Sequence, residues 1–357
     1  MVHGGDGGDG GRPGAVAGGA RAGVRLARDL GPQHLGRRVV VRRALADGSA
    51  GDVLGELVAW GPDRLAVRAR DGRDVLVEHG AVLAGKPVPP PPARRGAPEP
   101  DPGRVRADLA LERAAAQGWP PLEREELGGW LLRASAGFTG RGNAVLPLGD
   151  PGLPLDAALE RVVAWYAARG LVPRFQVPLP AARGLDADLL ARGWQAYHPT
   201  LVLTAATADV LAQVPDPGVA VEAAGRPAEG WLAAYHYRGA PLPPAARAVL
   251  EGGEQRAFLQ VPDPDGGPPL GIARVAVADG WAGLTAVEVA ERARGRGLAR
   301  ALLRAGCAWG AARGASGTYL QVAEDNGPAL ALYAGAGFAV HHRYRYLRPG
   351  DPVPVAP

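Results

Sequence analysis

One strand–loop–helix unit constrains the fold of this chain more than any other feature. Residues Leu284–Val289 form an alternating, β-branched run that predicts a strand, and Arg292-x-x-Gly295-x-Gly297 follows it directly. Apolar residues then recur at helical spacing from Leu298 to Trp309, with Gly314 as a helix stop. The unit predicts a mixed α/β architecture in which a glycine-rich loop joins a core strand to a helix.

The residues of this loop are suited to holding an anion. Gly295 and Gly297 let the backbone approach a ligand closely, and the amides at the start of the helix then face it. Arg294 and Arg296 can add positive charge at the rim. A diphosphate group fits this loop. The spacing matches neither a Walker loop nor the dinucleotide fingerprint, so neither of these two kinds of nucleotide site is expected. A simple helix-initiating turn is the alternative.

A second motif lies downstream and turns the pattern into a family resemblance. Glu324–Phe338 carries Asn326, then a predicted helix with Tyr333, then Gly337-Phe338. Together with the loop motif, this region resembles the core of the GNAT acetyltransferase superfamily. The two motifs cover about 60 residues, and the family domain would span 219–348, which we expect to be the catalytic domain.

The resemblance implies acetyl-CoA as co-substrate and assigns roles to individual residues. The backbone of the strand binds the pantetheine arm, the loop binds the diphosphate, and the downstream asparagine binds cofactor or orders a water. The implied cofactor-binding residues are Val287, Val289, Arg292, Arg294, Gly295, Arg296, Gly297, Leu298, Ala299 and Asn326. Asn326 is equally placed to cap the helix that follows it.

The resemblance also implies a direct attack of an unprotonated amine on the thioester, which needs an acid and a base. Tyr333 would protonate the departing thiolate, and Glu288 is the candidate base. Because side chains alternate along a strand, Glu288 can point into the cleft or away from it. Tyr333 can instead be a buried core residue without a catalytic role. Tyr235, His236 and Tyr237 would line an acceptor pocket or cover the core.

The N-terminal part has a different residue pattern. Residues 1–34 are a Gly-rich tail that we expect to be disordered. Short alternating runs separated by turn formers follow over 35–86, with a hairpin signal at Asp71-Gly72, and predict a small SH3-like β-barrel. A Pro-rich linker then spans 87–103, and a short tail covers 349–357.

The region between the linker and the catalytic domain resembles a second, altered copy. The order helix, strand, helix, strand recurs about 144 residues apart, so that Arg169–Trp194 and Arg313–Phe338 have equal length. Residues 104–210 lack the Arg-x-x-Gly-x-Gly motif, and Leu189 stands where Tyr333 stands in the later copy. We expect tandem GNAT-type halves with a degenerate first half. The whole chain resembles actinobacterial proteins sometimes described as histone-type acetyltransferases.

Composition limits the remaining possibilities. Apolar residues make up 47% of the 357 residues, and the formal net charge is only +4. The single cysteine, Cys307, falls within a predicted helix and reads as a small buried residue, and no metal site is predicted; His341-His342 reads as a surface pair. No segment resembles a signal peptide or membrane span, so a cytoplasmic monomer or homodimer is expected.

The acceptor stays open at this point. A small-molecule amine and a protein lysine both suit the chemistry, and a tandem arrangement also resembles mycothiol synthase. The alternative from another class is a non-catalytic acyl-CoA sensor whose barrel binds protein or DNA. For the barrel, a docking or spacer role is favoured over nucleic-acid binding, which would show a steep salt dependence.

Overall fold

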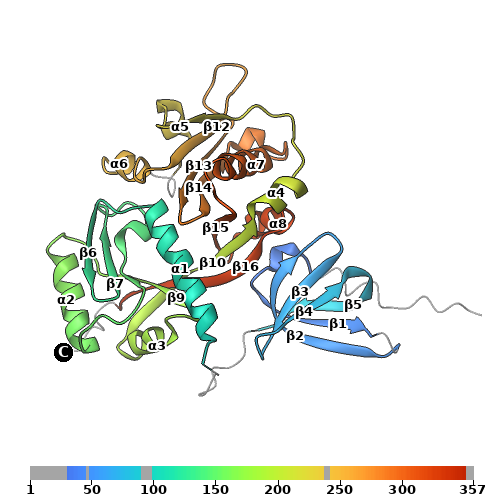
Figure 1. Cartoon of the computed structure of the whole chain (residues 1–357), viewed down its shortest axis with the longest axis horizontal. Coiled ribbons are helices and arrows are strands. Elements are labelled where there is room, and N and C mark those ends of the chain that lie inside the picture. The colour runs from blue at the N-terminus through green and yellow to red at the C-terminus, as the bar shows by residue number, and fades with distance from the viewer. Residues whose placement is uncertain (1–29, 46–47, 90–98, 237–241, 351–357) are drawn as a thin grey trace, which may run out of the picture.

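The computed structural model describes residues 30–45, 48–89, 99–236 and 242–350 (Figure 1). The tail before residue 30, most of the linker, Tyr237 and the residues after 350 therefore lie outside the described residues. Among the helices that are described, none has both the length and the apolar character needed to cross a membrane.

The expected small all-β module is confirmed. Its five strands form one antiparallel sheet in the order β4-β3-β2-β1-β5, beside the short 3-10 turns η3 (Pro32–His34) and η4 (His79–Ala81). The strands are β1 (Arg38–Ala44), β2 (Ala50–Trp60), β3 (Arg64–Ala69), β4 (Asp74–Glu78) and β5 (Val82–Pro87). The Asp71-Gly72 turn joins β3 to β4, and Gly72 has a φ of +87°, which a glycine adopts without strain.

The rest of the chain is built on an eight-stranded mixed sheet and a smaller three-stranded sheet. The large sheet has the order β11-β12-β13-β14-β15-β10-β16-β9. Its strands are β9 (Phe175–Leu179), β10 (Trp194–Ala206), β11 (Glu222–Ala224), β12 (Arg256–Val261), β13 (Gly271–Ala278), β14 (Trp281–Val289), β15 (Gly317–Ala323) and β16 (Ala339–Pro349). The small sheet contains β6 (Glu123–Leu127), β7 (Trp130–Ala134) and β8 (Leu146–Pro147).

Helices pack on these sheets and connect their strands. They are α1 (Pro102–Gly118), α2 (Leu155–Ala167), α3 (Arg183–Ala191), α4 (Thr207–Gln213), α5 (Glu229–Ala234), α6 (Ala246–Leu250), α7 (Leu298–Ala311) and α8 (Gly327–Ala334), with 3-10 turns η5 (Arg141–Asn143) and η7 (Glu291–Ala293). Asp101 begins α1 by accepting a hydrogen bond from the Arg104 amide at 2.8 Å.

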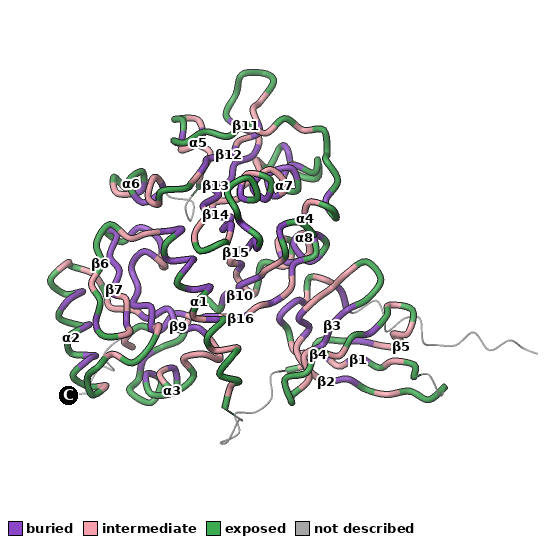
Figure 2. The backbone as a smooth tube through the Cα atoms, in the orientation of Figure 1, coloured by how far each residue is buried: buried purple, intermediate pink, exposed green. Residues whose placement is uncertain are grey.

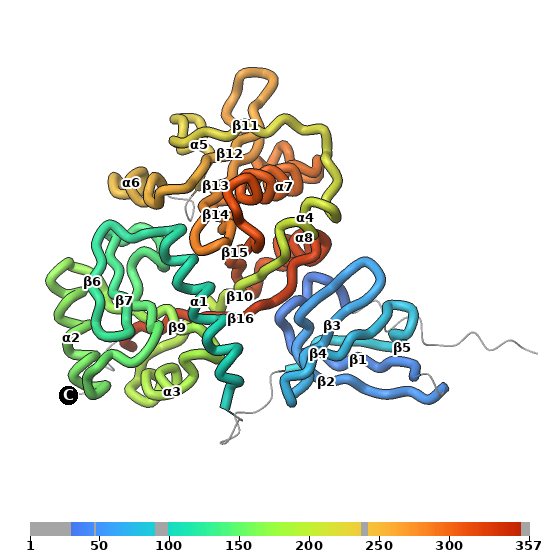
Figure 3. The backbone as a smooth tube through the Cα atoms, in the orientation of Figure 1, coloured from blue at the N-terminus to red at the C-terminus, as the bar shows by residue number. Residues whose placement is uncertain are grey.

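The two halves of this region exchange strands within the large sheet. Strand β10 lies between β15 and β16, although it precedes both by more than a hundred residues, and β16 in turn lies between β10 and β9. Figure 3 shows the yellow-green β10 and the red β16 running together through the middle of the molecule. The series α2, β9, α3, β10 and the series α7, β15, α8, β16 have the same order, as the 144-residue period predicts.

Buried residues lie mainly on the strands and on the sides of the helices that pack against the sheets, as Figure 2 shows. Cys307 in α7 is fully buried, and burial raises the pKa of its thiol to about 11. The expectation of an inert, buried cysteine is therefore confirmed, since the thiolate is the reactive form.

The β-module is attached to the strand-exchanged region through Arg343 on β16. Its guanidinium lies 2.5 Å from Glu56 on β2 and 3.2 Å from Glu324, and it donates to the Gly36 carbonyl at 3.1 Å. The turn η3 packs beside α8, where the Gln33 side chain approaches Gly327. The module thus touches the helix that carries Tyr333.

Candidate functional site

The glycine-rich loop presents unpaired amides in open space. Gly295 and Gly297 both have a φ of +77°, and a Cβ atom at either position would meet nothing within 4 Å. Gly297 is the N-cap of α7 without a side-chain cap. Within the described chain, the amides of Gly295 through Ala299 donate to no backbone carbonyl. These five residues therefore fit a bound diphosphate, since free amides at a helix N-terminus attract anions.

Strand β14 leaves its neighbour β15 just before this loop. The parallel pairing covers only Trp281 to Gly283 on β14, whereas the antiparallel pairing with β13 continues to Val289. The edge of β14 from Leu284 to Val289 that faces β15 is therefore open. Val287 and Val289, the residues expected to bind a pantetheine arm, lie on this open stretch.

A β-bulge bends β14 at the same place. Its register with β13 shifts so that Ala286 and Val287 together oppose Ala273, and Ala286 has a φ of +51°. A positive φ is strained for an alanine and is found where a structure forces it. Sequence reasoning missed this feature because no glycine marks the position.

Glu288 lies in a pocket of about 450 Å³ with part of the loop. Val289, Arg292 and Arg294 line the same pocket, together with His236 from the segment after α5. The Glu288 carboxylate accepts from the His236 amide at 3.1 and 3.2 Å, and its Oε2 lies 3.3 Å from His236 Nδ1. Glu288 thus lines the pocket, as its expected role requires, and its side chain is 30% exposed.

Tyr333 lies within the core of the second half, at 6% exposure. Its ring packs edge-on against Phe338 at 5.9 Å between centroids, and burial raises the pKa of its hydroxyl to about 12. Among the described residues, the hydroxyl makes no hydrogen bond. A protonated and unengaged hydroxyl can donate a proton to a ligand.

Three of the other expected binding residues have protein partners. Asn326 is the N-cap of α8 and accepts from the Ala329 amide at 3.2 Å, which leaves its side-chain amide group free. Arg292 lies 2.5 Å from Asp263 in an ion pair that ties the loop to the β12–β13 connection. Arg294 pairs with Glu291 at 3.6 Å, and the Arg296 side chain has no such contact within the described residues.

A second pocket of about 590 Å³ borders the first. Tyr235 and His236 line it together with Leu242 and Arg247, so both residues face a cavity, as their expected role in an acceptor pocket requires. Ala233 and His236 line both pockets, which places the two cavities next to each other.

The prediction of a surface histidine pair at His341-His342 was wrong. His342 is 2% exposed and its Nε2 donates to Glu112 Oε1 on α1 at 2.9 Å, and His341 is partly buried beside it. No local pattern in the sequence indicates this burial, because the partners lie more than 200 residues earlier, on α1.

Comparisons with known proteins agree with this fold. One family model, described as the probable histone acetyltransferase Rv0428c C-terminal region, matches residues 106–347. A second, described as the Rv0428c N-terminal Sm-like domain, matches residues 33–86, the range of the five-stranded module.

The match with each individual relative spans most of that relative's length. The probable histone acetyltransferase Rv0428c of Mycobacterium tuberculosis is 35% identical over 327 residues, which is 88% of this chain and 95% of the relative. The uncharacterized N-acetyltransferase YobR of Bacillus subtilis is 28% identical over 250 residues, 67% of this chain and 98% of the relative. A solved GCN5-related N-acetyltransferase from Kribbella flavida shares the fold, with a TM-score of 0.50 at 20% identity over 68% of this chain and 96% of that chain.

Proposed function

The chain belongs to the family of the probable histone acetyltransferase Rv0428c, a family of GNAT-type N-acetyltransferases, and from this premise we propose that it transfers an acetyl group from acetyl-CoA to a primary amine. The open edge of β14 beside the unpaired loop amides carries the proposal. An extended ligand arm can add its hydrogen bonds to the free edge while its diphosphate reaches Gly295–Ala299.

Glu288 and Tyr333 are assigned the two proton transfers that aminolysis of a thioester needs. Glu288, held by His236, takes the proton that the attacking amine must lose, directly or through a water. Tyr333 keeps its own proton because its pKa is raised, and it donates that proton to the departing thiolate. A free amide of the open β14 edge stabilises the negative charge that develops on the carbonyl oxygen.

The acceptor enters through the pocket that Tyr235 and His236 line next to Glu288. Both a small-molecule amine and a lysine side chain present the primary amine that this chemistry needs. The relative in Mycobacterium tuberculosis is called a probable histone acetyltransferase, which supports a protein lysine as the first acceptor to test.

The first half lacks the features that support binding in the second. In the connection from β8 to α2, residues 148–154, only Gly152 has a positive φ, and the N-cap of α2 is Pro154. Leu189, at the position that corresponds to Tyr333, is fully buried and has no proton to donate. We infer that the chain binds one acetyl-CoA.

Calorimetric titration of acetyl-CoA into the full-length protein tests this function, together with a thiol-release assay on lysine-containing histone peptides and small amines. We expect one site per chain and thiol release that depends on the acceptor. Two sites would contradict the degenerate first half. Absence of binding at millimolar acetyl-CoA would overturn the proposed function, and binding without turnover on any amine would reduce the protein to an acyl-CoA-binding module.

A further inference from the structure

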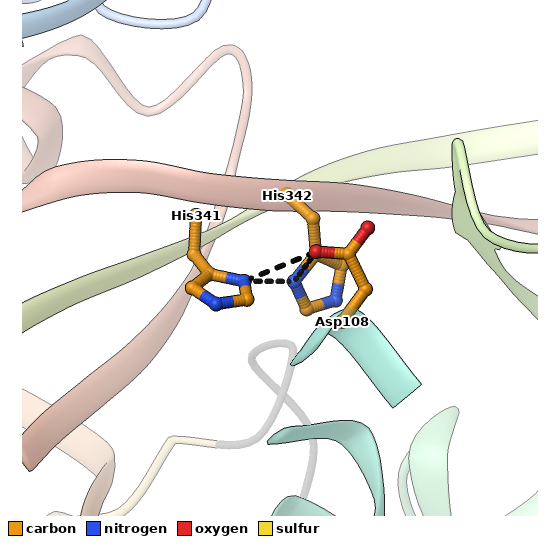
Figure 4. A group of neighbouring side chains, drawn as sticks. All are labelled: Asp108, His341 and His342. Atoms are coloured by element: carbon orange, nitrogen blue, oxygen red, sulfur yellow. Dashed lines mark hydrogen bonds and ion pairs between the residues drawn. The ribbon is translucent and has the colours of Figure 1, made fainter. Parts of the chain in front are cut away.

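Three metal-ligand side chains meet between α1 and β16, away from the loop motif in the sequence. His341 Nδ1 lies 2.9 Å from His342 Nδ1 and 3.3 Å from Asp108 Oδ1, and His342 Nδ1 lies 3.8 Å from the same oxygen. Figure 4 shows both imidazoles below the β16 ribbon, turned toward the carboxylate from α1.

A second β-bulge brings the two histidines to the same side. Consecutive residues of a strand normally point to opposite faces. In the pairing of β16 with β10, however, Val202 opposes His342 and Leu203 opposes Val340, so that His341 is an extra residue without a counterpart. The bulge re-aims His341 and lets both rings face Asp108.

Asp108 is a buried carboxylate that the protein leaves without a hydrogen bond among the described residues. It is 0% exposed, and both of its oxygens lack a hydrogen-bond partner within the described residues. The nearby Arg104 donates instead to the His341 carbonyl. Buried polar atoms are nearly always satisfied, and an isolated buried carboxylate is costly, so this carboxylate indicates a missing partner.

Glu112, one turn further along α1, provides a matched contrast. It is equally buried, but its oxygens contact His342 Nε2 at 2.9 Å and Gln176 Nε2 at 2.8 Å. A carboxylate on the far nitrogen of an imidazole sets the tautomer, because Nε2–H donates to Glu112 and Nδ1 keeps its lone pair. Metal-binding histidines typically have this arrangement.

We propose that Asp108, His341 and His342 bind a divalent transition-metal cation of the zinc type. The three donor atoms are 2.9 to 3.8 Å apart. Ligands at about 2.0–2.1 Å in a tetrahedron are separated by about 3.4 Å, which lies within that range. Two imidazoles and one carboxylate favour zinc over calcium or magnesium, which prefer oxygen ligands. His341 is 22% exposed, so the fourth position can hold a water.

A cation here would join the first helix after the linker to a strand that both halves share. Its binding energy would be added to the folded state, because the three ligands come together only in that state. The site uses none of the residues assigned to acetyl transfer. The proposal of a metal site therefore does not depend on that activity.

Cobalt(II) is the probe, because its visible absorption reports tetrahedral coordination. Chelator-treated full-length protein is titrated with cobalt and then with zinc in competition, and bound metal per chain is measured by mass spectrometry. We expect one cobalt per chain with tetrahedral bands, displacement by zinc, and a higher melting temperature with zinc than with chelator.

Asp108→Asn and His341→Gln should each weaken cobalt binding at least tenfold, while His198→Asn, at an exposed histidine on β10, should leave it unchanged. Asp108→Asn removes a buried charge, so its metal-free form should melt no lower than that of the parent. Failure of the parent to bind cobalt or zinc at millimolar metal would overturn the proposal. So would tetrahedral binding that survives both substitutions.

Discussion

The carboxylate of Glu288 on β14 is held by the backbone amide of His236, at 3.1 and 3.2 Å, from a segment 52 residues earlier. This contact holds the carboxylate in the smaller pocket, and His236 also lines the neighbouring pocket. We expect Glu288→Gln to lower kcat/KM for an amine acceptor about 100-fold, because an amide accepts no proton. The affinity for acetyl-CoA, measured by calorimetry, should not change.

Glu291→Gln is the matched control for Glu288. Glu291 lies in the same stretch of chain, is almost fully exposed and, among the described residues, forms an ion pair with Arg294. Its substitution should leave kcat/KM within a factor of two or so of the parent, as for an exposed ion pair. Equal kcat/KM for Glu288→Gln and the parent would remove Glu288 as the base.

Tyr333→Phe tests the acid. The substitution keeps the ring against Phe338 and removes only the hydroxyl, so we expect kcat to fall about 100-fold without loss of folding or acetyl-CoA binding. Tyr197→Phe, which keeps the ring stacked on Tyr346, is the control and should retain activity. Unchanged turnover in Tyr333→Phe would show that the thiolate leaves without this proton.

The raised pKa of Tyr333 also predicts the pH profile. A hydroxyl whose pKa is about 12 stays protonated above the ordinary tyrosine value. Activity should therefore rise as the amine substrate loses its proton and should not fall as the pH passes about 10. An alkaline decline near that pH that is absent from Tyr333→Phe would show that the hydroxyl titrates normally.

Gly297→Ala separates ligand binding from backbone strain. An alanine at a φ of +77° costs about 1–2 kcal/mol, and its Cβ would project into the space in front of the loop amides. Gly266→Ala is the control, since Gly266 has a φ of +76° and equally open surroundings on the β12–β13 loop. Both variants should melt at similar temperatures, but only Gly297→Ala should lose acetyl-CoA affinity, by about tenfold. Equal affinities would exclude the loop as the diphosphate site.

Arg343 should control how firmly the five-stranded module is attached. Arg343→Met removes the contacts to Glu56, Glu324 and the Gly36 carbonyl. We expect faster amide exchange in η3 and β2, corresponding to a loss of about 1 kcal/mol, because the pair is partly exposed. Arg348→Met on the same strand, which among the described residues loses a side-chain contact with the Tyr197 ring, should leave that exchange unchanged.

Local features were predictable because neighbouring residues determine them. The hairpin at Asp71-Gly72, the helix that begins after Gly297 and the cap at Asn326 depend on φ preferences and on bonds within a few residues. The 144-residue period also predicted that the two halves repeat the same series of elements. Hydrophobic periodicity, which reflects burial on one face, was sufficient for that.

The exchange of strands between the halves could not be read in this way. The residues of β10 do not indicate that it pairs with β15 and β16 rather than with a strand of its own half. Any of these pairings is compatible with the same alternation of apolar and polar side chains. For the same reason, the bulges at Ala286 and His341 were not predicted: a bulge depends on the register with another strand.

The sequence by itself determined the kind of chemistry, because the loop glycines, Asn326 and Tyr333 form motifs whose spacing is local to one strand–loop–helix and one helix. Only the tertiary structure decided which distant groups meet: Glu288 with His236, and Asp108 with His341 and His342. Those meetings depend on strand order, register and the packing of α1 on the sheet. These are collective results of burying apolar surface, and no short stretch of residues encodes them.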